Sequence, residues 1–537
     1  MVRVPNKVLL KIFAATNRQP GPGLAAWFPY WTKLMAVCTH WRDLICGTPE
    51  FWQKISVGRN PLWLELCLQR SQRLLIQLSF WHPVVIEQTL KGLRPHWSRI
   101  ENLAFRELDC AQFTGSQTWL TTPPLPQLQT LILNVRHKHH RGRDGNSEHD
   151  DTGAILMLQT GLLPRLKTLR LEGISLTGEP IAFSTLRVLE LCEYNASRPL
   201  FTTVQFITLL NSCTSLERLR IMDNALRAVV SSPVGERDEA LVAQLSPRLR
   251  MMTVQGHVEE ISSLLSHVSV PAHVDLFLST REETEEAAAA AAFNMLPPSR
   301  LRRNVGMLQA ATRLKIDSCH ENHKEIKVIA TRGLGTGSSG RLELRVHTPS
   351  GKDMRGSQAR RVYYKGILRA VSDMFPDARL NTLVCGGDLD AITESEWRDR
   401  LLAHYPTIRT LVVDDGEFGG DAVPFFRAMG TTVVQMRYGG IKPPCPDLEY
   451  LWIRNAEPTV KLMEEVKKCL SRRQYHDVAP LKRLRLELNP DYERPVEDVS
   501  GYVPLLKRAV PQFEFKVWRR DVDDEEMFSN TNEDLPF

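Results

Sequence analysis

A short pattern, apolar-x-x-apolar-x-apolar, recurs along most of this chain and constrains its fold more than any other feature. Neighbouring copies are irregularly spaced, mostly by about 20 to 40 residues, which is typical of solenoid proteins, whose stacked repeats share one core. The eleven copies are IENLAF at 100, LQTLIL at 128, LKTLRL at 166, LRVLEL at 186, LERLRI at 216, LRMMTV at 249, ATRLKI at 311, LNTLVC at 380, IRTLVV at 408, LEYLWI at 448 and LKRLRL at 481.

The end of each copy predicts a β-strand, in the manner of a leucine-rich repeat. Side chains alternate along a strand, so the last two apolar residues face the core and the residue between them faces the other way, on the concave side. Segments 202–213 and 460–470 are expected to form the convex side, and 513–518 the last strand. The alternative is an unrelated α/β fold in which some copies arise by chance.

The N-terminal segment predicts short helices. Pro5 suits a first helical turn, and Val8, Leu9, Ile12 and Phe13 follow at helical spacing. A second apolar stripe, Leu34, Val37, Trp41, Leu44 and Ile45, precedes a break at GTPEFW, where Thr48 is a plausible N-cap before Pro49. A small helical cap on a larger domain would also explain this segment.

These residues resemble an F-box, and more narrowly that of fungal, basidiomycete-type F-box proteins. VPNKVLLKIF matches the first helix of that family, LMAVCTHWRDLI the second and TPEFW the third. The resemblance implies a trihelical domain that binds the Skp-type adaptor of cullin-RING ubiquitin ligases. The implied adaptor-binding residues are Pro5, Val8, Leu9, Ile12, Phe13, Val37, Cys38, Trp41 and Leu44.

Three departures from the family pattern bear on adaptor affinity. Val4 stands where leucine is usual, Lys7 stands where glutamate is usual, and the link over residues 16–31 is long. Because Met1 lies close to the motif, the sequence leaves open whether an upstream arm is missing. Whether the departures abolish adaptor binding also stays open at the level of sequence.

The expected fold class is therefore α/β, an N-terminal trihelical F-box followed by an irregular leucine-rich-repeat-like solenoid. The expected domains are the F-box over 1–57, a helix-strand connector over 58–99, the solenoid over 100–518 and an acidic disordered tail over 519–537. Polar or glycine-rich insertions are expected at 136–153, 231–239, 331–340 and 348–360, and a short helix at 282–293.

Composition excludes few classes but favours an intracellular protein in the cytoplasm or nucleus. The net charge of +6, from 68 basic and 62 acidic residues, is weak support for nucleic-acid or membrane binding. No stretch approaches the roughly 18 apolar residues of a membrane span, and no signal peptide is apparent. None of the ten cysteines has CxxC spacing, which predicts reduced thiols rather than disulfides or zinc ligands.

No catalytic, cofactor or metal motif is convincing. Gly335, Gly337 and Gly340 satisfy GxGxxG, but a strand pattern follows where a nucleotide site needs a helix, so a hairpin loop is favoured. The histidines of 137–149 lack a rigid scaffold, and Asp414-Asp415 suits a strand end. We expect no enzyme activity and no cofactor; an enzyme interpretation rests only on these weak motifs.

The resemblance implies a substrate-recognition subunit of a Skp–cullin–F-box ubiquitin ligase, whose repeats bind a protein target. The alternative is a non-ligase scaffold with a degenerate F-box. Concave positions that could bind the target, preferably an acidic or phosphorylated segment, are Arg170, Arg220, Lys315, Trp452 and Arg485. Solvated basic residues and a Trp452 packed on a neighbouring loop would be the plainer interpretation.

Overall fold

The computed structural model describes the chain in segments, with gaps at several loops and at both ends. The described residues are 4–16, 31–58, 60–81, 89, 92–109, 113, 124–136, 154–157, 162–177, 184–192, 203–222, 242–281, 285–318, 325–333, 340–347, 358–387, 392–414, 420–435, 440–476, 478–489 and 497–517. Most of the predicted 16–31 link, most of the predicted insertions and the predicted acidic tail at 519–537 lie outside them.

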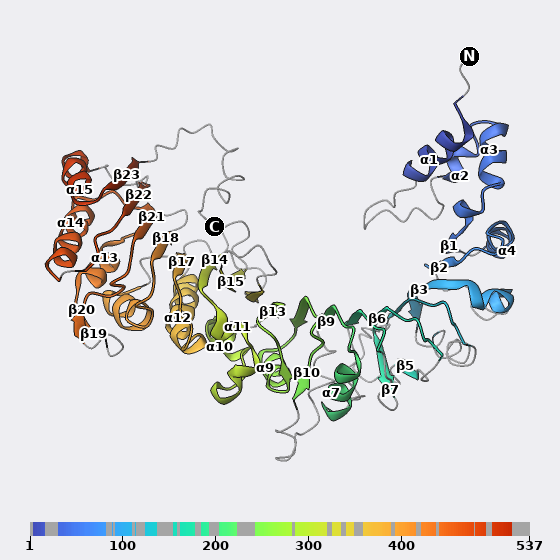
Figure 1. Cartoon of the computed structure of the whole chain (residues 1–537), viewed down its shortest axis with the longest axis horizontal. Coiled ribbons are helices and arrows are strands. Elements are labelled where there is room, and N and C mark those ends of the chain that lie inside the picture. Colours follow the sequence, from blue (N-terminus) through green and yellow to red (C-terminus); the bar gives the residue numbers. More distant parts are fainter. Residues whose placement is uncertain are drawn as a thin grey trace, which may run out of the picture. The chain divides into compact units, whose positions relative to one another are not determined.

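The chain divides into two units, Met1–Leu249 and Arg250–Phe537. Each unit is mixed α/β and contains a mostly parallel sheet (Figure 1). The two units are described separately below.

The first unit begins with short helices and continues into parallel strands (Figure 1). The helical part contains α1 (Asn6–Thr16), α2 (Trp31–Leu34), α3 (Thr39–Cys46) and the 3-10 turn η1 (Pro49–Trp52). The sheet has the order β1 (Lys54–Val57), β2 (Ile76–Phe80), β3 (Ile100–Asp109), β4 (Thr130–Arg136), β6 (Thr168–Glu172), β8 (Val188–Cys192) and β9 (Arg218–Met222). Further elements are α4 (Pro61–Arg70), η2 (Arg94–Arg99), α7 (Thr203–Ser212), β10 (Ala243–Gln244) and a separate parallel pair, β5 (Ala154–Met157) and β7 (Ile174–Thr177).

The second unit contains a mostly parallel sheet with a reversed strand. Its order is β11 (Met251–Gln255), β13 (Asp275–Arg281), β16 (Arg341–His347), β15 (Glu325–Thr331), β14 (Arg313–Ser318), β17 (Thr382–Gly386), β18 (Thr410–Asp414), β21 (Tyr450–Ala456), β22 (Arg483–Leu488) and β23 (Gln512–Val517). The reversed strand is β15, which runs antiparallel to its neighbours β14 and β16.

Helices of the second unit cover one face of its sheet, as α12 to α15 do beside β17 to β23 in Figure 1. The helices are α9 (Val258–Ser266), α10 (Glu285–Asn294), α11 (Met307–Ala310), α12 (Gln358–Met374), α13 (Val423–Gly430), α14 (Val460–Tyr475) and α15 (Val503–Ala509). Smaller elements are β12 (Val268–Ser269), η4 (Ser299–Asn304), the π-helical η6 (Glu396–Leu402), η7 (Ser500–Tyr502) and the antiparallel pair β19 (Val433–Gln435) and β20 (Gly440–Lys442). None of the described helices combines the length and apolar character needed to cross a membrane.

The recurring pattern explains how the parallel strands align. The fourth residue of successive copies is paired in register, and each of these leucines is buried. In the first unit the row is Leu103, Leu131, Leu169, Leu189 and Leu219, and in the second it is Leu314, Leu383, Leu411, Leu451 and Leu484. Burying one such side chain stabilises the fold by about 1.5–3 kcal/mol.

A tight turn precedes many copies and sets where the strand begins. In each case the backbone N–H of the first apolar residue donates to the carbonyl three residues earlier. Examples are Leu128 to Leu125 at 3.1 Å, Leu166 to Leu163 at 3.2 Å, Ile408 to Tyr405 at 3.2 Å and Leu448 to Cys445 at 3.1 Å. The proline-containing lead-ins in the sequence are therefore turn signals.

Several expectations are confirmed and others need correction. The strand at 341–347, the last strand and the helices at 203–212 and 460–475 are present. The antiparallel pairing of β15 with β16 fits the hairpin loop expected at residues 335–340, of which 335–339 lie outside the described residues. The sheet begins at Lys54 rather than at residue 100, because β1 and β2 already pair with each other and β2 pairs with β3.

Candidate protein-interaction surfaces

The N-terminal helices pack around aromatic rings. Phe13 on α1 is 1% exposed, and its ring centroid lies 4.8 Å from that of Trp41 on α3 and 6.5 Å from that of Phe51. Buried Trp52 lies 4.6 Å from Trp31 and donates its indole N–H to the Ile45 carbonyl at 3.0 Å. These contacts join the three short helical segments and η1 into one packed cluster.

Hydrogen bonds fix the ends of these short helices. The carbonyl of Pro5 accepts from the N–H groups of Val8 and Leu9 at 2.9 and 3.1 Å, so the proline begins α1 as expected. Thr48 occupies the position before η1, but it makes no side-chain cap. Its hydroxyl instead donates to the Leu44 carbonyl at 2.7 Å and ties η1 to the end of α3.

This helical segment exposes several apolar side chains. Val4, Val8, Ile12 and Val37 are 48%, 44%, 49% and 59% exposed, and Val8 and Ile12 lie one turn apart on α1. We call Val4, Val8, Ile12 and Val37 the apolar stripe. Single exposed apolar residues are ordinary, but several on one short helical segment favour a contact surface.

The stripe corrects the predicted grouping of adaptor-binding residues. Leu9 and Phe13 were expected to share a face with Ile12, but both are buried against the other helices while Ile12 points outward. Pro5 and Cys38 are exposed, and Trp41 and Leu44 are half-buried. The nine predicted residues therefore divide into an inward group that holds the segment together and an outward group that a partner can reach.

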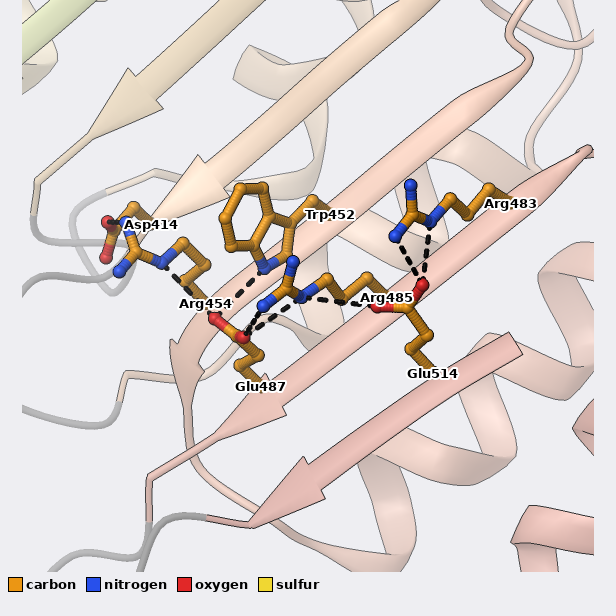
Figure 2. A network of polar contacts seen from close by, with 7 residues as sticks. All are labelled: Asp414, Trp452, Arg454, Arg483, Arg485, Glu487 and Glu514. Carbon is orange, nitrogen blue, oxygen red and sulfur yellow. Dashed lines mark hydrogen bonds and ion pairs between the residues drawn. The ribbon is translucent and has the colours of Figure 1, made fainter. Parts of the chain in front are cut away.

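A second candidate surface lies on the face of the second unit's sheet opposite its described helices. Figure 2 shows Trp452 of β21 with charged residues of β18, β21, β22 and β23 in front of the strands, and helices behind them. Val384, Val412, Trp452 and Arg485 are paired in register across four strands, as the alternation rule predicts. Trp452 is nevertheless only 3% exposed and packs in a small cluster with Val384 and Val412.

Charged groups enclose the Trp452 indole. The guanidinium carbons of Arg485 and Arg454 lie 4.3 and 4.9 Å from its ring centroid, within cation–π range. The indole N–H donates to the buried Glu487 carboxylate at 3.2 Å. Arg454 also approaches Glu487 at 3.4 Å and Asp414 at 3.2 Å. Glu487 is thus the shared acceptor at the centre of this group.

The network extends to the last strand, where it becomes more exposed. Arg485 pairs with Glu487 and lies 3.6 Å from Glu514, and the Arg483 Nε donates to Glu514 at 2.8 Å. Burial opposes the charge on Arg485, but its hydrogen bond with Glu487 and the nearby carboxylates outweigh this and raise its pKa. Asn455, with a φ of +57°, donates to Asp414 at 2.9 Å and anchors the β21 end of the network.

Three of the predicted cationic target positions, Arg170, Lys315 and Arg485, are paired with carboxylates. Arg170 lies 3.4 Å from Glu172 and 3.6 Å from Glu190, and Lys315 lies 2.9 Å from Asp317. Arg220 stands in register beside Glu190. The predicted target positions are one residue per copy, the one between its last two apolar residues. The residue two positions later faces the same side and supplies the counter-charge in β6, β14 and β22.

Because of this pairing, an acidic target on the row of predicted cations would compete with carboxylates of the chain itself; such a target stays a prediction. An acidic segment would have to displace carboxylates that already pair with Arg485 and Lys315. Trp452 is likewise covered by two arginines instead of standing open as a hot spot. Trp452 is packed against neighbouring residues, as the plainer interpretation predicted, but the residues that cover it lie on strands and not on a loop.

The motifs discounted from sequence have structural explanations where they are described. Gly340 precedes β16, and a Cβ there would overlap the Ala272 carbonyl, so close backbone approach requires glycine. Gly335, Gly337 and the histidines of 137–149 lie outside the described residues. Among the described residues, no group of three or more histidine, cysteine or acidic side chains could hold a metal.

Comparison with known proteins assigns no family to this chain. A scan against family models finds no match, and a search of curated proteins finds no similar sequence.

Proposed function

We propose that this chain is a protein-interaction subunit that binds a Skp-type adaptor through its N-terminal helices and a protein target through its strand face. The apolar stripe Val4, Val8, Ile12 and Val37 carries the proposal. A short helical segment with its aromatic core already filled still presents these side chains to solvent. An apolar groove on a partner would bury them, as in other helix-in-groove contacts.

The resemblance of this segment to an F-box is the reason for proposing a Skp-type adaptor as its partner. In a Skp–cullin–F-box ligase the chain would form and break no bonds itself. It would hold a target lysine near a ubiquitin-charged enzyme elsewhere in the assembly and so raise the effective concentration of the reacting groups. The cytoplasm or nucleus is the compartment that this role requires.

A non-ligase scaffold is the alternative, and exposed Lys7 favours it. Lys7 lies on α1 beside the apolar stripe, at the position where the family usually has glutamate. An adaptor surface suited to that acid would meet a positive charge instead. Binding of the adaptor together with a cullin supports the ligase role, whereas adaptor-free binding of another partner supports the scaffold.

The target surface is proposed on the strand face around Glu514, Arg483 and Arg485. Arg483 and Glu514 keep 38% and 44% of their side chains exposed, so they are within reach of a partner. Arg483, Arg485 and Glu514 carry charges of both signs. The matching target surface would therefore be polar with both signs of charge, rather than an acidic segment.

The decisive experiment changes the apolar stripe without touching the aromatic core. A Val8→Asp, Ile12→Asp variant of the full chain is expected to capture a recombinant Skp-type adaptor at least about 100-fold less tightly, because two apolar contacts are lost and two carboxylates are buried. Val204→Asp is the matched control, since Val204 is a 40% exposed apolar residue on α7. Unchanged capture by the double variant, with the control also unchanged, would show that the stripe is not the adaptor contact.

A further inference from the structure

The last strand of the second unit, β23, leaves the core of its sheet partly uncovered. Its one neighbour among the described strands is β22, to which it is paired in parallel. Phe513 and Phe515 stand in register with Leu484 and Leu486 of β22, and both of these leucines are 0% exposed. The two phenylalanine rings stack with centroids 6.3 Å apart, yet they are only half-buried. The row of core residues therefore ends at a face that solvent still reaches.

The strand at the other end of the described sheets is covered more fully. β1 also has one described neighbour, β2, but its residues Ile55 and Val57 are each only 2% exposed. An outermost strand is commonly protected by a covering element, a proline or a bulge. α15 packs against β23 (Figure 1), but β23 contains no proline, and its register with β22 runs without a break. Its backbone is thus a regular edge to which another strand can add.

The outer edge of β23 presents the hydrogen-bonding groups of alternate residues. The Gln512 N–H donates to the Lys482 carbonyl at 3.2 Å, so the even-numbered residues of β23 direct their backbone groups toward β22. The N–H and C=O groups of Phe513, Phe515 and Val517 therefore point to the outer edge. A strand added there would pair with these three residues.

We propose that β23 pairs in antiparallel fashion with β23 of a second copy of this chain, about a two-fold axis at Phe515. In this register Glu514 of each copy lies opposite Lys516 of the other, so both cross-strand pairs have opposite charges. On the core side Phe515 meets Phe515, and Phe513 meets Val517. An axis at residue 514 would place two glutamates opposite each other, and an axis at 516 two lysines, which is unfavourable.

The apolar rings and the backbone edge would supply most of the affinity of this contact. Glu514 already accepts a hydrogen bond from Arg483 at 2.8 Å, so the cross-strand charges mainly select the register. Pairing covers the half-buried rings of Phe513 and Phe515 and gives the edge N–H and C=O groups partners, as in other strand additions. The sheet of one copy then continues into that of the other. This contact goes beyond the proposed adaptor and target surfaces, although Glu514 also belongs to the latter.

Sedimentation velocity of the full chain over a series of concentrations tests the proposal. We expect a monomer–dimer equilibrium that Lys516→Glu weakens by about 10-fold or more, because both cross-strand pairs become like-charged. Glu514→Lys should weaken it similarly. An equimolar mixture of these two variants should dimerise again, because opposite charges then face each other between unlike chains. Lys467→Glu is the matched control, since it makes the same charge change at an exposed residue of α14.

Val517→Pro tests the backbone edge without changing any charge. The Val517 N–H points away from β22, so a proline there removes a group of the outer edge and leaves the pairing of β22 with β23 intact. This variant is also expected to weaken the dimer by about 10-fold or more, because the bonds between residues 513 and 517 of the two copies are lost. Its unfolding temperature, measured with those of the charge variants, shows that each chain is folded.

Three results would overturn the proposal. They are a wild-type chain that stays monomeric throughout the series, a dimer that Lys516→Glu and Val517→Pro leave unchanged, and a dimer that forms only after residues 521–537 are removed. In the third case the chain's own C-terminal segment would occupy the edge instead of a second copy. The adaptor experiment is independent of all three, since its variants change α1 and these change β23 or the segment that follows it.

Discussion

The N-terminal helices and the C-terminal strand face use similar residue types in opposite ways. Around α1 the aromatic rings are buried, while Val8, Ile12 and Val37 remain exposed. Around β21 the tryptophan is buried beneath arginines, and each arginine is paired with Glu487, Glu514 or Asp414. The first surface therefore still exposes apolar side chains to solvent. On the second surface the arginines already pair with carboxylates of the chain itself.

This difference teaches which surface depends on another molecule. Exposed apolar side chains gain free energy only when something covers them. A paired ionic network gains little from a new partner unless that partner preserves its hydrogen bonds. The four predictions below test this contrast, beginning with the largest expected effect.

The aromatic core should carry the stability of the helical segment, and the apolar stripe should not. Phe13→Ala is expected to cost about 3–5 kcal/mol, because it removes a buried ring that contacts Trp41 and Phe51. Ile12→Ala, one residue away, should cost less than about 1 kcal/mol. Urea unfolding followed by tryptophan fluorescence measures both; equal losses would mean that Ile12 is part of the core.

Glu487 should be the residue on which the strand network depends. Glu487→Ala is expected to cost about 3 kcal/mol or more, because it leaves Arg454 and Arg485 without their shared buried partner. Glu514→Ala removes an exposed carboxylate from the same network and should cost about 0–1 kcal/mol. Thermal unfolding of the two variants compares them, and a larger loss for Glu514 would contradict the central place given to Glu487.

Thiol labelling should distinguish an exposed cysteine of the N-terminal helical segment from buried cysteines elsewhere in the chain. Burial raises the pKa of Cys469 and of Cys192 to about 11, so both are expected to resist alkylation near pH 8, whereas exposed Cys38 should react. The adaptor should slow Cys38 labelling by about 10-fold if it covers the apolar stripe nearby. Peptide mass mapping gives the rates; undiminished Cys38 labelling at saturating adaptor would place the contact elsewhere.

Lys7 should give the smallest effect. Lys7→Glu is expected to tighten adaptor binding by up to about 1 kcal/mol, the scale of an exposed ion pair, if the adaptor surface suits an acid. Titration of the adaptor against both proteins at low and high salt measures the change. Unchanged or weaker binding would show that residue 7 makes no favourable contact across the interface.

The sequence alone predicted much of the strand register. Leu383, Leu411 and Leu451 stand at the same place in their copies, and the structure pairs them across three strands. The prediction succeeds because alternation along a strand and the turn before it are local properties. It did not predict β13, whose strand lacks the recurring pattern, and it indicated the reversed strand β15 only indirectly, through the hairpin loop expected before β16.

Tertiary structure decided which predicted residues are available to a partner. Helical spacing alone could not tell whether Leu9 or Ile12 faces inward; the positions of Trp41 and Phe51 decide it, and both come from later helices. Likewise Trp452 and Arg485 were correctly assigned to one side of the sheet, but their burial and pairing depend on Glu487 and Arg454 of the same two strands. The period of a sequence pattern determines which way neighbouring side chains point along one helix or strand. The exposure of each side chain depends on the residues that other helices and strands place beside it.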